Sequence, residues 1–298
     1  AYCKAQYDCL PLSEAWKLVQ SEVGLERPII SITFDDGYAD NFEYARPILK
    51  DFGIRATFFV VSALIGSARL TWYDRLARAA THLRRQGAPA PMISTDSEPF
   101  DRVVRGLWSA PERAFSPKSL VHRAKSLSTA ARELVDREFT EAARARGWTG
   151  GEEDRLMTKE QLRRLLADGH EIGSHSRHHP ILTSLDRETL EDELVRSRSE
   201  LEEILSEEVT AFAYPNGDYD GTGSRALQRA GYLAAVTMKP GLNDGTTNPH
   251  ELRRFEILQE YWRSERRACS ESLFALETTG LAEAFFLRSL RRRHGRVR

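Results

Sequence analysis

Three short segments of the chain carry side chains whose types and spacing could do chemistry. The first, TFDDG at 33–37, places Asp35 and Asp36 side by side immediately before a glycine. Adjacent like charges repel each other, and a divalent cation would remove that repulsion, because one carboxylate can bind the ion while the other stays ionised in its field. We therefore expect a bound cation next to this segment.

The second segment, HSRHHP at 175–180, contains three imidazoles. His175 and His179 are four residues apart, a spacing that on one helical turn places both rings on the same side and within reach of a single ion. One carboxylate with two imidazoles leaves coordination positions open, which is typical of a catalytic metal site rather than a structural one. His178 fits neither ligand position, and we expect it to be exposed.

Neither segment alone is specific evidence for a metal site, since DDG is usually a turn and an isolated histidine is more often a packed core residue than a ligand. Their positions after predicted strands strengthen the interpretation. Asp36 follows a strand predicted at 28–34, His175 follows one predicted at 170–174, and a third segment, FAYPNG at 212–217, ends another. Ligands of parallel α/β sheets bind beyond the carboxyl ends of the strands. The sequence therefore predicts a single metal site at that edge.

The strands belong to an alternating pattern of strands and helices. A strand at 28–34, a helix at 41–53 and a strand at 55–62 form a parallel βαβ unit. The same alternation resumes at residue 158 and continues to residue 238. We expect a single α/β domain over residues 1–298.

Two parts of the chain depart from this alternation. Residues 64–155 contain amphipathic helical sequence without a convincing strand, which predicts a helical insertion, and residues 262–298 predict a C-terminal helical extension. Amphipathic helices rich in charge usually present a solvated face, so scaffolding is favoured over a substrate-shaping lid for the insertion.

The composition excludes some classes of protein. With 43 basic and 44 acidic residues in 298, the net charge of -1 offers no general attraction to nucleic acid or to an anionic membrane. The three cysteines lack a paired spacing, which favours a reducing, cytoplasmic compartment. No apolar run predicts a transmembrane segment, and the first residues do not have the order of a signal peptide. Localisation and oligomeric state stay open.

Together, TFDDG, HSRHHP and FAYPNG resemble the first three motifs of the polysaccharide deacetylases, the NodB-homology group also called carbohydrate esterase family four. The order of the motifs and their positions after strands agree with that family, and the resemblance covers residues 27–62 and 156–257. It implies a distorted (β/α) barrel and a metal-dependent hydrolase, in which a metal-bound water attacks the acyl carbonyl of an N-acetylated or O-acetylated sugar. The substrate would be a polysaccharide, a lipid-linked sugar or a small glycoside.

The resemblance also implies a role for each site residue. It makes Asp35 the general base, Asp36, His175 and His179 the metal ligands, and the backbone N–H of Tyr214 a donor to the oxyanion. The cation would lower the pKa of its water and, with that N–H, stabilise the oxyanion. Zinc is the expected metal, and cobalt, nickel, manganese and iron also suit one carboxylate with two imidazoles.

Two departures from the family pattern concern the base and the general acid. Ala213 stands where members commonly have an arginine that orients the base, and Arg254 in ELRRFEI is similar to the arginine that other members supply from a later strand; its neighbour Arg253 is expected to face solvent. The histidine that acts as general acid in the family is not recognisable after residue 257. His294 lies in a basic tail and His250 precedes the LRRF strand, so neither is expected to be this acid. The proton for the leaving group would then come from the insertion or from the metal-bound water.

Two other functions stay open on the sequence alone. The same triad suits a non-haem iron oxygenase, and a barrel without its acid histidine could be a carbohydrate-binding protein that has lost catalysis. Within the insertion, Trp72 and Tyr73 either stack on a sugar or anchor their helix to the core.

Overall fold

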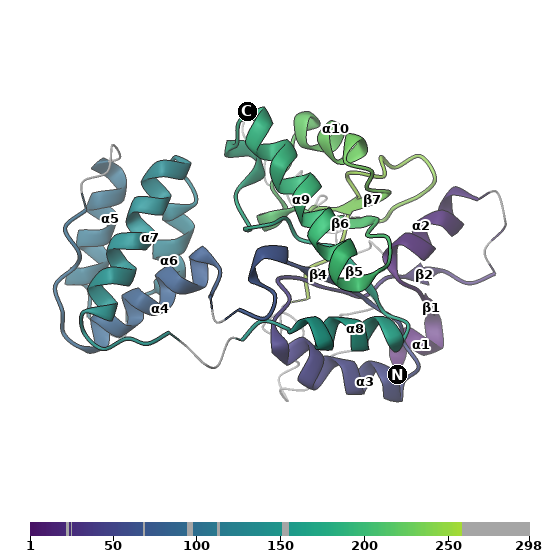
Figure 1. Cartoon of the computed structure of the whole chain (residues 1–298), viewed down its shortest axis with the longest axis horizontal. Helices are drawn as coiled ribbons and strands as arrows, with labels where there is room; N and C mark the ends of the chain where they lie inside the picture. Colours follow the sequence, from purple (N-terminus) through teal and green to yellow (C-terminus); the bar gives the residue numbers. More distant parts are fainter. Residues whose placement is uncertain are drawn as a thin grey trace, which may run out of the picture.

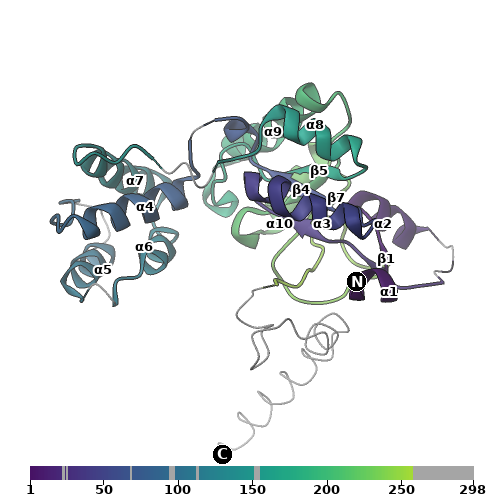
Figure 2. The same ribbon diagram turned by 90° about the horizontal axis from the view of Figure 1, so that it is seen from below.

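The computed structural model describes residues 1–257 except 22, 23, 25, 68, 94–97, 112, 113 and 151–154. Figure 1 shows two groups of elements: an α/β body that contains the strands, and helices α4–α7, which lie to one side of it. Figure 2 shows the same separation from below. Among the described helices, none is both long and apolar enough to cross a membrane.

The α/β body is built on a five-stranded sheet in which neighbouring strands pair in parallel. The strands lie in chain order: β3 (Thr33–Phe34), β4 (Thr57–Val60), β5 (Glu171–Ser174), β6 (Ala211–Ala213) and β7 (Ala234–Val236). Because all the strands run the same way, their carboxyl ends meet at one edge. The predicted α/β class is therefore confirmed.

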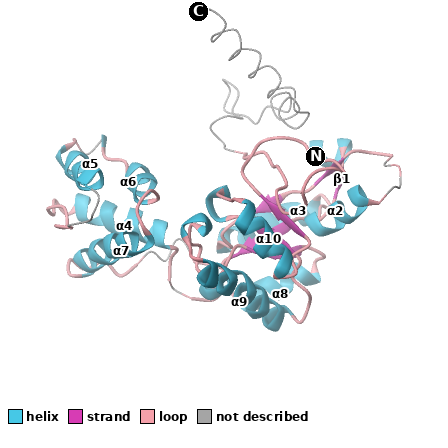
Figure 3. Cartoon of the chain, turned by 90° about the horizontal axis from the view of Figure 1, so that it is seen from above, coloured by secondary structure: helices cyan, strands magenta, loops and turns pink. Residues whose placement is uncertain are grey.

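Helices connect the strands and surround the sheet. A π-helical turn (Asn41–Ala45) and α3 (Arg46–Asp51) join β3 to β4, and the later connections contain α8 (Lys159–Ala167), α9 (Arg187–Leu205) and α10 (Gly221–Arg229). Figure 3 shows the strands in the interior with these helices around them. Strands β4, β6 and β7 are thereby buried at every residue, whereas the two residues of β3 are partly exposed.

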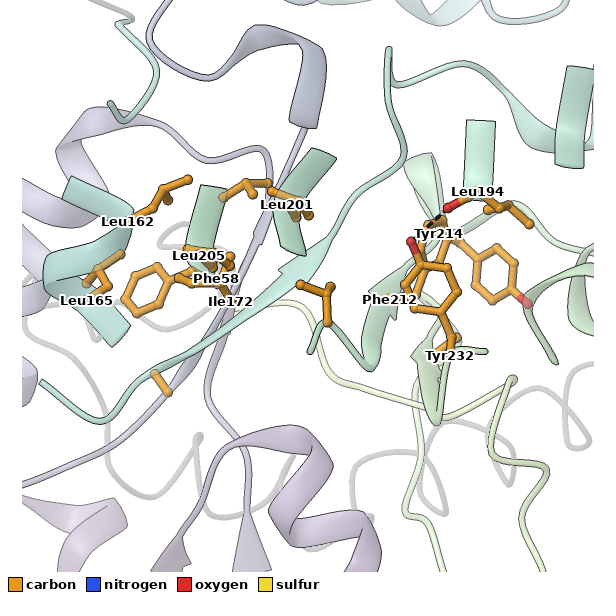
Figure 4. Close-up of a cluster of buried hydrophobic side chains, with 14 of the residues drawn as sticks. Phe58, Leu162, Leu165, Ile172, Leu194, Leu201, Leu205, Phe212, Tyr214 and Tyr232 are labelled. Carbon is orange, nitrogen blue, oxygen red and sulfur yellow. Dashed lines mark hydrogen bonds between the residues drawn. The ribbon is translucent and has the colours of Figure 1, made fainter. Parts of the chain in front are cut away.

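An apolar core between sheet and helices fixes the strands in place. Strand β4 is buried at every residue, as expected for a parallel strand covered on both faces. Phe58 stacks on Phe34 with ring centroids 4.8 Å apart. Figure 4 shows the central cluster, whose labelled side chains are Phe58, Leu162, Leu165, Ile172, Leu194, Leu201, Leu205, Phe212, Tyr214 and Tyr232.

The N-terminal region forms a second, two-stranded sheet that the sequence analysis did not predict. It contains α1 (Tyr2–Gln6), β1 (Asp8–Cys9), α2 (Leu12–Gln20) and β2 (Ile29–Ile30). β2 pairs with β1, whereas Thr33 and Phe34 pair with β4. The single strand predicted at 28–34 is therefore wrong, because an apolar run does not show where a strand changes its partner.

The segment predicted as a helical insertion contains α4 (Trp72–Arg85), α5 (Glu98–Ser109), α6 (Pro117–Ala124) and α7 (Thr129–Arg144). These helices bury an apolar core of their own, which includes Leu76, Ala80, Leu83, Leu120, Val135 and Phe139. A separate core is what an inserted unit would have, while the assignment of residues 1–298 to one domain stays a prediction. The extension predicted at 262–298 lies outside the described residues.

Candidate metal centre and active site

The side chains of the predicted metal site meet at the carboxyl edge of the five-stranded sheet. Asp36 follows β3, and the HSRHHP segment follows β5. One donor atom from each of Asp36, His175 and His179 lies within 4.8 Å of the other two. Nε2 of His175 is 3.5 Å and Nε2 of His179 is 3.4 Å from the same oxygen, Oδ1 of Asp36. The structure thus brings the three predicted ligands together.

The three donor atoms are spaced as ligands of one cation would be. Ligands bound about 2.0 Å from a tetrahedral zinc ion lie about 3.3 Å from each other, close to the two distances above. Oδ1 of Asp36 is buried and makes no hydrogen bond within the described part of the chain. Such an oxygen is costly to bury, and coordination to a cation would remove that cost. The residues present therefore fit a divalent cation.

The neighbouring strand orients the imidazole of His175. Its Nδ1–H donates to the carbonyl oxygen of Ala213 at 2.7 Å, because a carbonyl can only accept. Nε2 is thereby directed at Asp36, an arrangement common among metal-binding histidines. Burial would lower the pKa of His175, but the contact of Nε2 with the Asp36 carboxylate and the charges of Asp35 and Asp36 raise it above its usual value. A cation would therefore displace a proton from this ring.

The HSRHHP segment is a loop, so the helical turn predicted to bring His175 and His179 together is wrong. Ser176 and His179 have positive φ angles of 63° and 59°, which a right-handed helix does not contain. The N–H of His179 donates to Oγ of Ser176 at 3.0 Å. This loop conformation, rather than a helical period, places both Nε2 atoms beside Asp36.

A buried glutamate that the sequence analysis missed holds this loop. Glu193 on α9 accepts the backbone N–H groups of Arg177 and His178 at 2.9 and 3.0 Å, and Nδ1 of His178 lies 2.6 Å from its other carboxylate oxygen. His178 is half exposed and pairs with Glu193 instead of the metal ligands, in agreement with its prediction. In the sequence, Glu193 is one of several acidic residues on an amphipathic helix, so no local signal distinguishes it.

The turn after β3 separates the two adjacent carboxylates. Asp36 and Gly37 have positive φ angles of 69° and 79°. A Cβ atom on Gly37 would lie 2.9 Å from Cγ1 of Val60, so both the backbone conformation and the available space require glycine. Asp36 then faces the imidazoles, while Asp35 faces a cationic side chain from later in the chain.

That cation is Arg254, which forms a bidentate ion pair with Asp35. Its Nη1 and Nη2 atoms donate to the two carboxylate oxygens at 2.8 and 2.6 Å, and its Nε donates to the carbonyl of Thr237 at 2.9 Å. Burial would raise the pKa of Asp35, but the charge of His175 and the hydrogen bonds and charge of Arg254 hold it below its usual value. Asp35 is therefore ionised at neutral pH, as a general base must be.

The backbone N–H of Tyr214 does not point into the site, so its predicted role as oxyanion donor is wrong. It donates to the carbonyl of Val236 at 3.1 Å as part of the pairing between β6 and β7. Asn216, two residues later, has a φ of 58°, and its side-chain nitrogen is buried without a hydrogen-bond partner among the described residues. Asn216 is thus an unpaired donor at the same edge of the sheet.

His250, considered above as a general acid, is directed away from the site. Its Nε2 lies 2.9 Å from the carbonyl of Tyr232, which precedes β7, whereas the site side chains follow their strands. His250 is buried there and has a packing role. The other candidate, His294, lies outside the described residues, and Arg253 is exposed as predicted.

The insertion contacts the site through the first turn of α4. Nε1–H of Trp72 donates to the carbonyl of His179 at 3.2 Å, and the Tyr73 ring packs edge to face on the His179 ring, with centroids 4.9 Å apart. Burial, with the charge of His175, lowers the pKa of His179 to about 4. Both aromatic residues anchor their helix to the α/β body, which is one of the two roles predicted for them.

Comparison with solved structures shows the same fold in two proteins, one of them a known deacetylase. The Streptococcus pyogenes deacetylase PplD, solved in complex with acetate, superposes with a TM-score of 0.54 at 18% identity, over 86% of this chain and 77% of PplD. IcaB from Ammonifex degensii gives a TM-score of 0.55 at 16% identity, over 88% of this chain and 81% of IcaB. The curled, parallel five-stranded half-barrel confirms the predicted distorted (β/α) barrel of the NodB-homology type.

Sequence comparison gives the family. A Bacillus subtilis (strain 168) protein named "Putative polysaccharide deacetylase YxkH" is 20% identical over 251 residues, which span 84% of this chain but only 59% of YxkH. The chain therefore covers less than two thirds of that relative. The family model for polysaccharide deacetylase matches residues 22–91 and 129–235, more than half of the chain and both sides of the segment that holds α5 and α6. With the strand-end motifs in the positions described above, the chain belongs to the polysaccharide deacetylase family.

Proposed function

We propose that this protein is a metal-dependent deacetylase that hydrolyses an N-acetyl or O-acetyl group on a sugar. The observation that supports this most strongly is the pairing, at one edge of the sheet, of a three-donor cation site with an ionised carboxylate, Asp35, held by Arg254. The family supplies the reaction class, and acetate bound to the similarly folded PplD suggests the product. The substrate would be a polysaccharide, a lipid-linked sugar or a small glycoside.

Each residue of the site has a distinct task in this proposal. A bound divalent cation, for which zinc is our first choice, would supply an activated water and polarise the acyl carbonyl. Asp36, His175 and His179 would hold it. Asp35 would accept the proton that the attacking water loses, and Arg254 keeps this carboxylate ionised and fixes its direction. Because His250 is directed elsewhere, we propose that Asp35 itself returns the proton to the leaving nitrogen or oxygen.

We propose Asn216, in place of Tyr214, as a donor to the oxyanion. Its buried, unpaired side-chain nitrogen lies three residues after Ala213, whose carbonyl contacts His175. Asn216→Gly removes this donor while the backbone keeps its positive φ without strain. We expect kcat to fall about a hundredfold or more with little change in KM, as for other single oxyanion donors. An unchanged kcat, measured on a variant that unfolds at the wild-type temperature, would contradict this assignment.

The decisive test of the proposed function is acetate release. Acetylated oligosaccharides, nucleotide sugars and small glycosides are incubated with the protein as prepared, with chelator, and with zinc or cobalt added back. We expect acetate release that chelator abolishes and metal restores, because a cation contributes several kcal/mol of transition-state stabilisation. Since about 1.4 kcal/mol corresponds to a tenfold change in rate, removal of the metal should cost about a thousandfold.

The same screen separates the other two functions. An iron oxygenase would need dioxygen, whereas hydrolysis should proceed at the same rate under nitrogen. A carbohydrate-binding protein without catalysis would bind acetylated sugars and release no acetate from any of them. Release that persists in chelator would show that the cation is not required.

A further inference from the structure

The two metal-ligating histidines are held by different means. His175 is fixed by the hydrogen bond from its Nδ1 to the carbonyl of Ala213. Nδ1 of His179 is buried and has no hydrogen-bond partner within the described residues. Apart from the contact of its Nε2 with Asp36, the His179 ring is therefore oriented by packing, and the Tyr73 ring, 4.9 Å away between centroids, packs against it.

The Tyr73 ring is itself held at its hydroxyl. The Tyr73 hydroxyl lies 3.5 Å from that of Tyr38, whose own proton is donated to Asp74. Tyr73 is therefore the donor in its contact with Tyr38, and this contact ties the Tyr73 ring to the segment that follows β3.

The helix that carries Tyr73 is fixed from both sides. On the side of the insertion, Arg75 donates from Nε to both carboxylate oxygens of the buried Asp136 on α7 at 3.0 Å. On the side of the α/β body, Trp72 donates to the carbonyl of His179 at 3.2 Å. Asp74 accepts from Thr71 at 2.8 Å as well as from Tyr38. Tyr73 lies in this first turn of α4, so its backbone is fixed and its side chain can hold the residues that it contacts.

From these contacts we propose that Tyr73 is a positioning residue of the metal centre. Its ring holds the imidazole of His179, so that the insertion completes a site whose ligands all come from the α/β body. Supporting residues behind metal ligands commonly matter for affinity because they reduce the freedom that the ligands lose on binding. The inference rests on the metal site of the proposed function, and it does not depend on the acyl substrate.

The test is zinc affinity, measured by calorimetry or by competition with a chromophoric chelator in the absence of any sugar. Tyr73→Leu loses the ring, and we expect its dissociation constant for zinc to rise about tenfold to a hundredfold. Tyr73→Phe keeps the ring and should bind zinc close to the wild type. Tyr44→Phe, at a residue that is 69% exposed, is the matched control and should bind as the wild type does.

A purely structural role is excluded by two further measurements on Tyr73→Leu. The first is the rise of its unfolding temperature on adding zinc, which should be smaller than in the wild type whatever the unfolding temperature without metal. The second is acetate release, which should be low at limiting zinc and recover towards the wild-type kcat at excess zinc.

The outcomes separate this inference from the proposed function. Wild-type zinc affinity in Tyr73→Leu overturns the inference, even if the wild type releases acetate. Zinc binding that weakens in the variant, together with no acetate release by the wild type on any substrate, supports the inference and overturns the proposed function. A wild-type protein that binds none of zinc, cobalt, nickel, manganese and iron overturns both.

Discussion

Replacing His175 by alanine should abolish zinc binding and reduce acetate release by about a thousandfold or more. The substitution removes one of three donor atoms that converge on one point, and it leaves Oδ1 of Asp36 with a single imidazole beside it. Loss of a supporting residue behind a ligand costs about ten- to a hundredfold in affinity, and loss of a ligand itself should cost more. Without the cation, several kcal/mol of transition-state stabilisation are lost.

The neighbouring His178→Ala is the control for this experiment. His178 belongs to the same loop but pairs with Glu193, and its backbone N–H bond to Glu193 does not require the side chain. Zinc binding in His178→Ala should therefore stay close to that of the wild type. Measurement of bound zinc per protein after dialysis, alongside the rate of acetate release, distinguishes the two variants. Equal zinc content in wild type and His175→Ala would show that His175 is not a ligand.

Asp35→Asn should lower kcat by about a hundredfold to ten-thousandfold while zinc binding is retained. Asparagine has nearly the same shape and keeps one oxygen for Arg254, but it cannot accept a proton at neutral pH. The pKa of Asp35 is held below its usual value, so the wild-type carboxylate is already ionised throughout the neutral range and is lost as a base only in acid. Single-turnover acetate release with excess zinc measures the effect on the chemical step.

Two controls make the result for Asp35 specific. Asp40→Asn changes an exposed carboxylate in the same segment and should leave kcat unchanged. Arg254→Met removes the bidentate partner and should also lower kcat, because the carboxylate of Asp35 loses the hydrogen bonds that orient it. If Asp35→Asn instead loses zinc, the roles of the two adjacent aspartates are the reverse of those proposed.

The strands and their chemically important ends were largely predictable from the sequence. Apolar runs identified β4, β5, β6 and β7, and the alternation of strands with helices implied a parallel sheet. Parallel pairing by itself requires that the residues after these strands lie at one edge, so Asp36 and His175 could be placed together without coordinates. Arg254 was predicted from a resemblance in its local sequence, and the structure places it on Asp35.

The predictions were wrong where the structure depends on hydrogen-bond partners that are distant in the sequence. The N–H of Tyr214 is used by Val236, a residue 22 positions later, and the residues at 28–34 divide between partners in two sheets. The backbone of the HSRHHP segment is held by Glu193. This residue accepts the N–H groups of His178 and Arg177, which lie 15 and 16 positions before it in the sequence. None of these partners lies within the span over which a helical or strand period operates.

The sequence by itself determined the class of fold, the family and the donor types of the candidate metal site, because these depend on local periodicity, on short motifs and on the direction of parallel strands. Only the tertiary structure decided how those donors are held. Tyr73 shows the difference: in the sequence it is an aromatic residue near the start of an amphipathic helix, and in the structure it packs on His179, which is 106 residues away. Packing between distant segments is set by the whole core, and no window of sequence contains both surfaces.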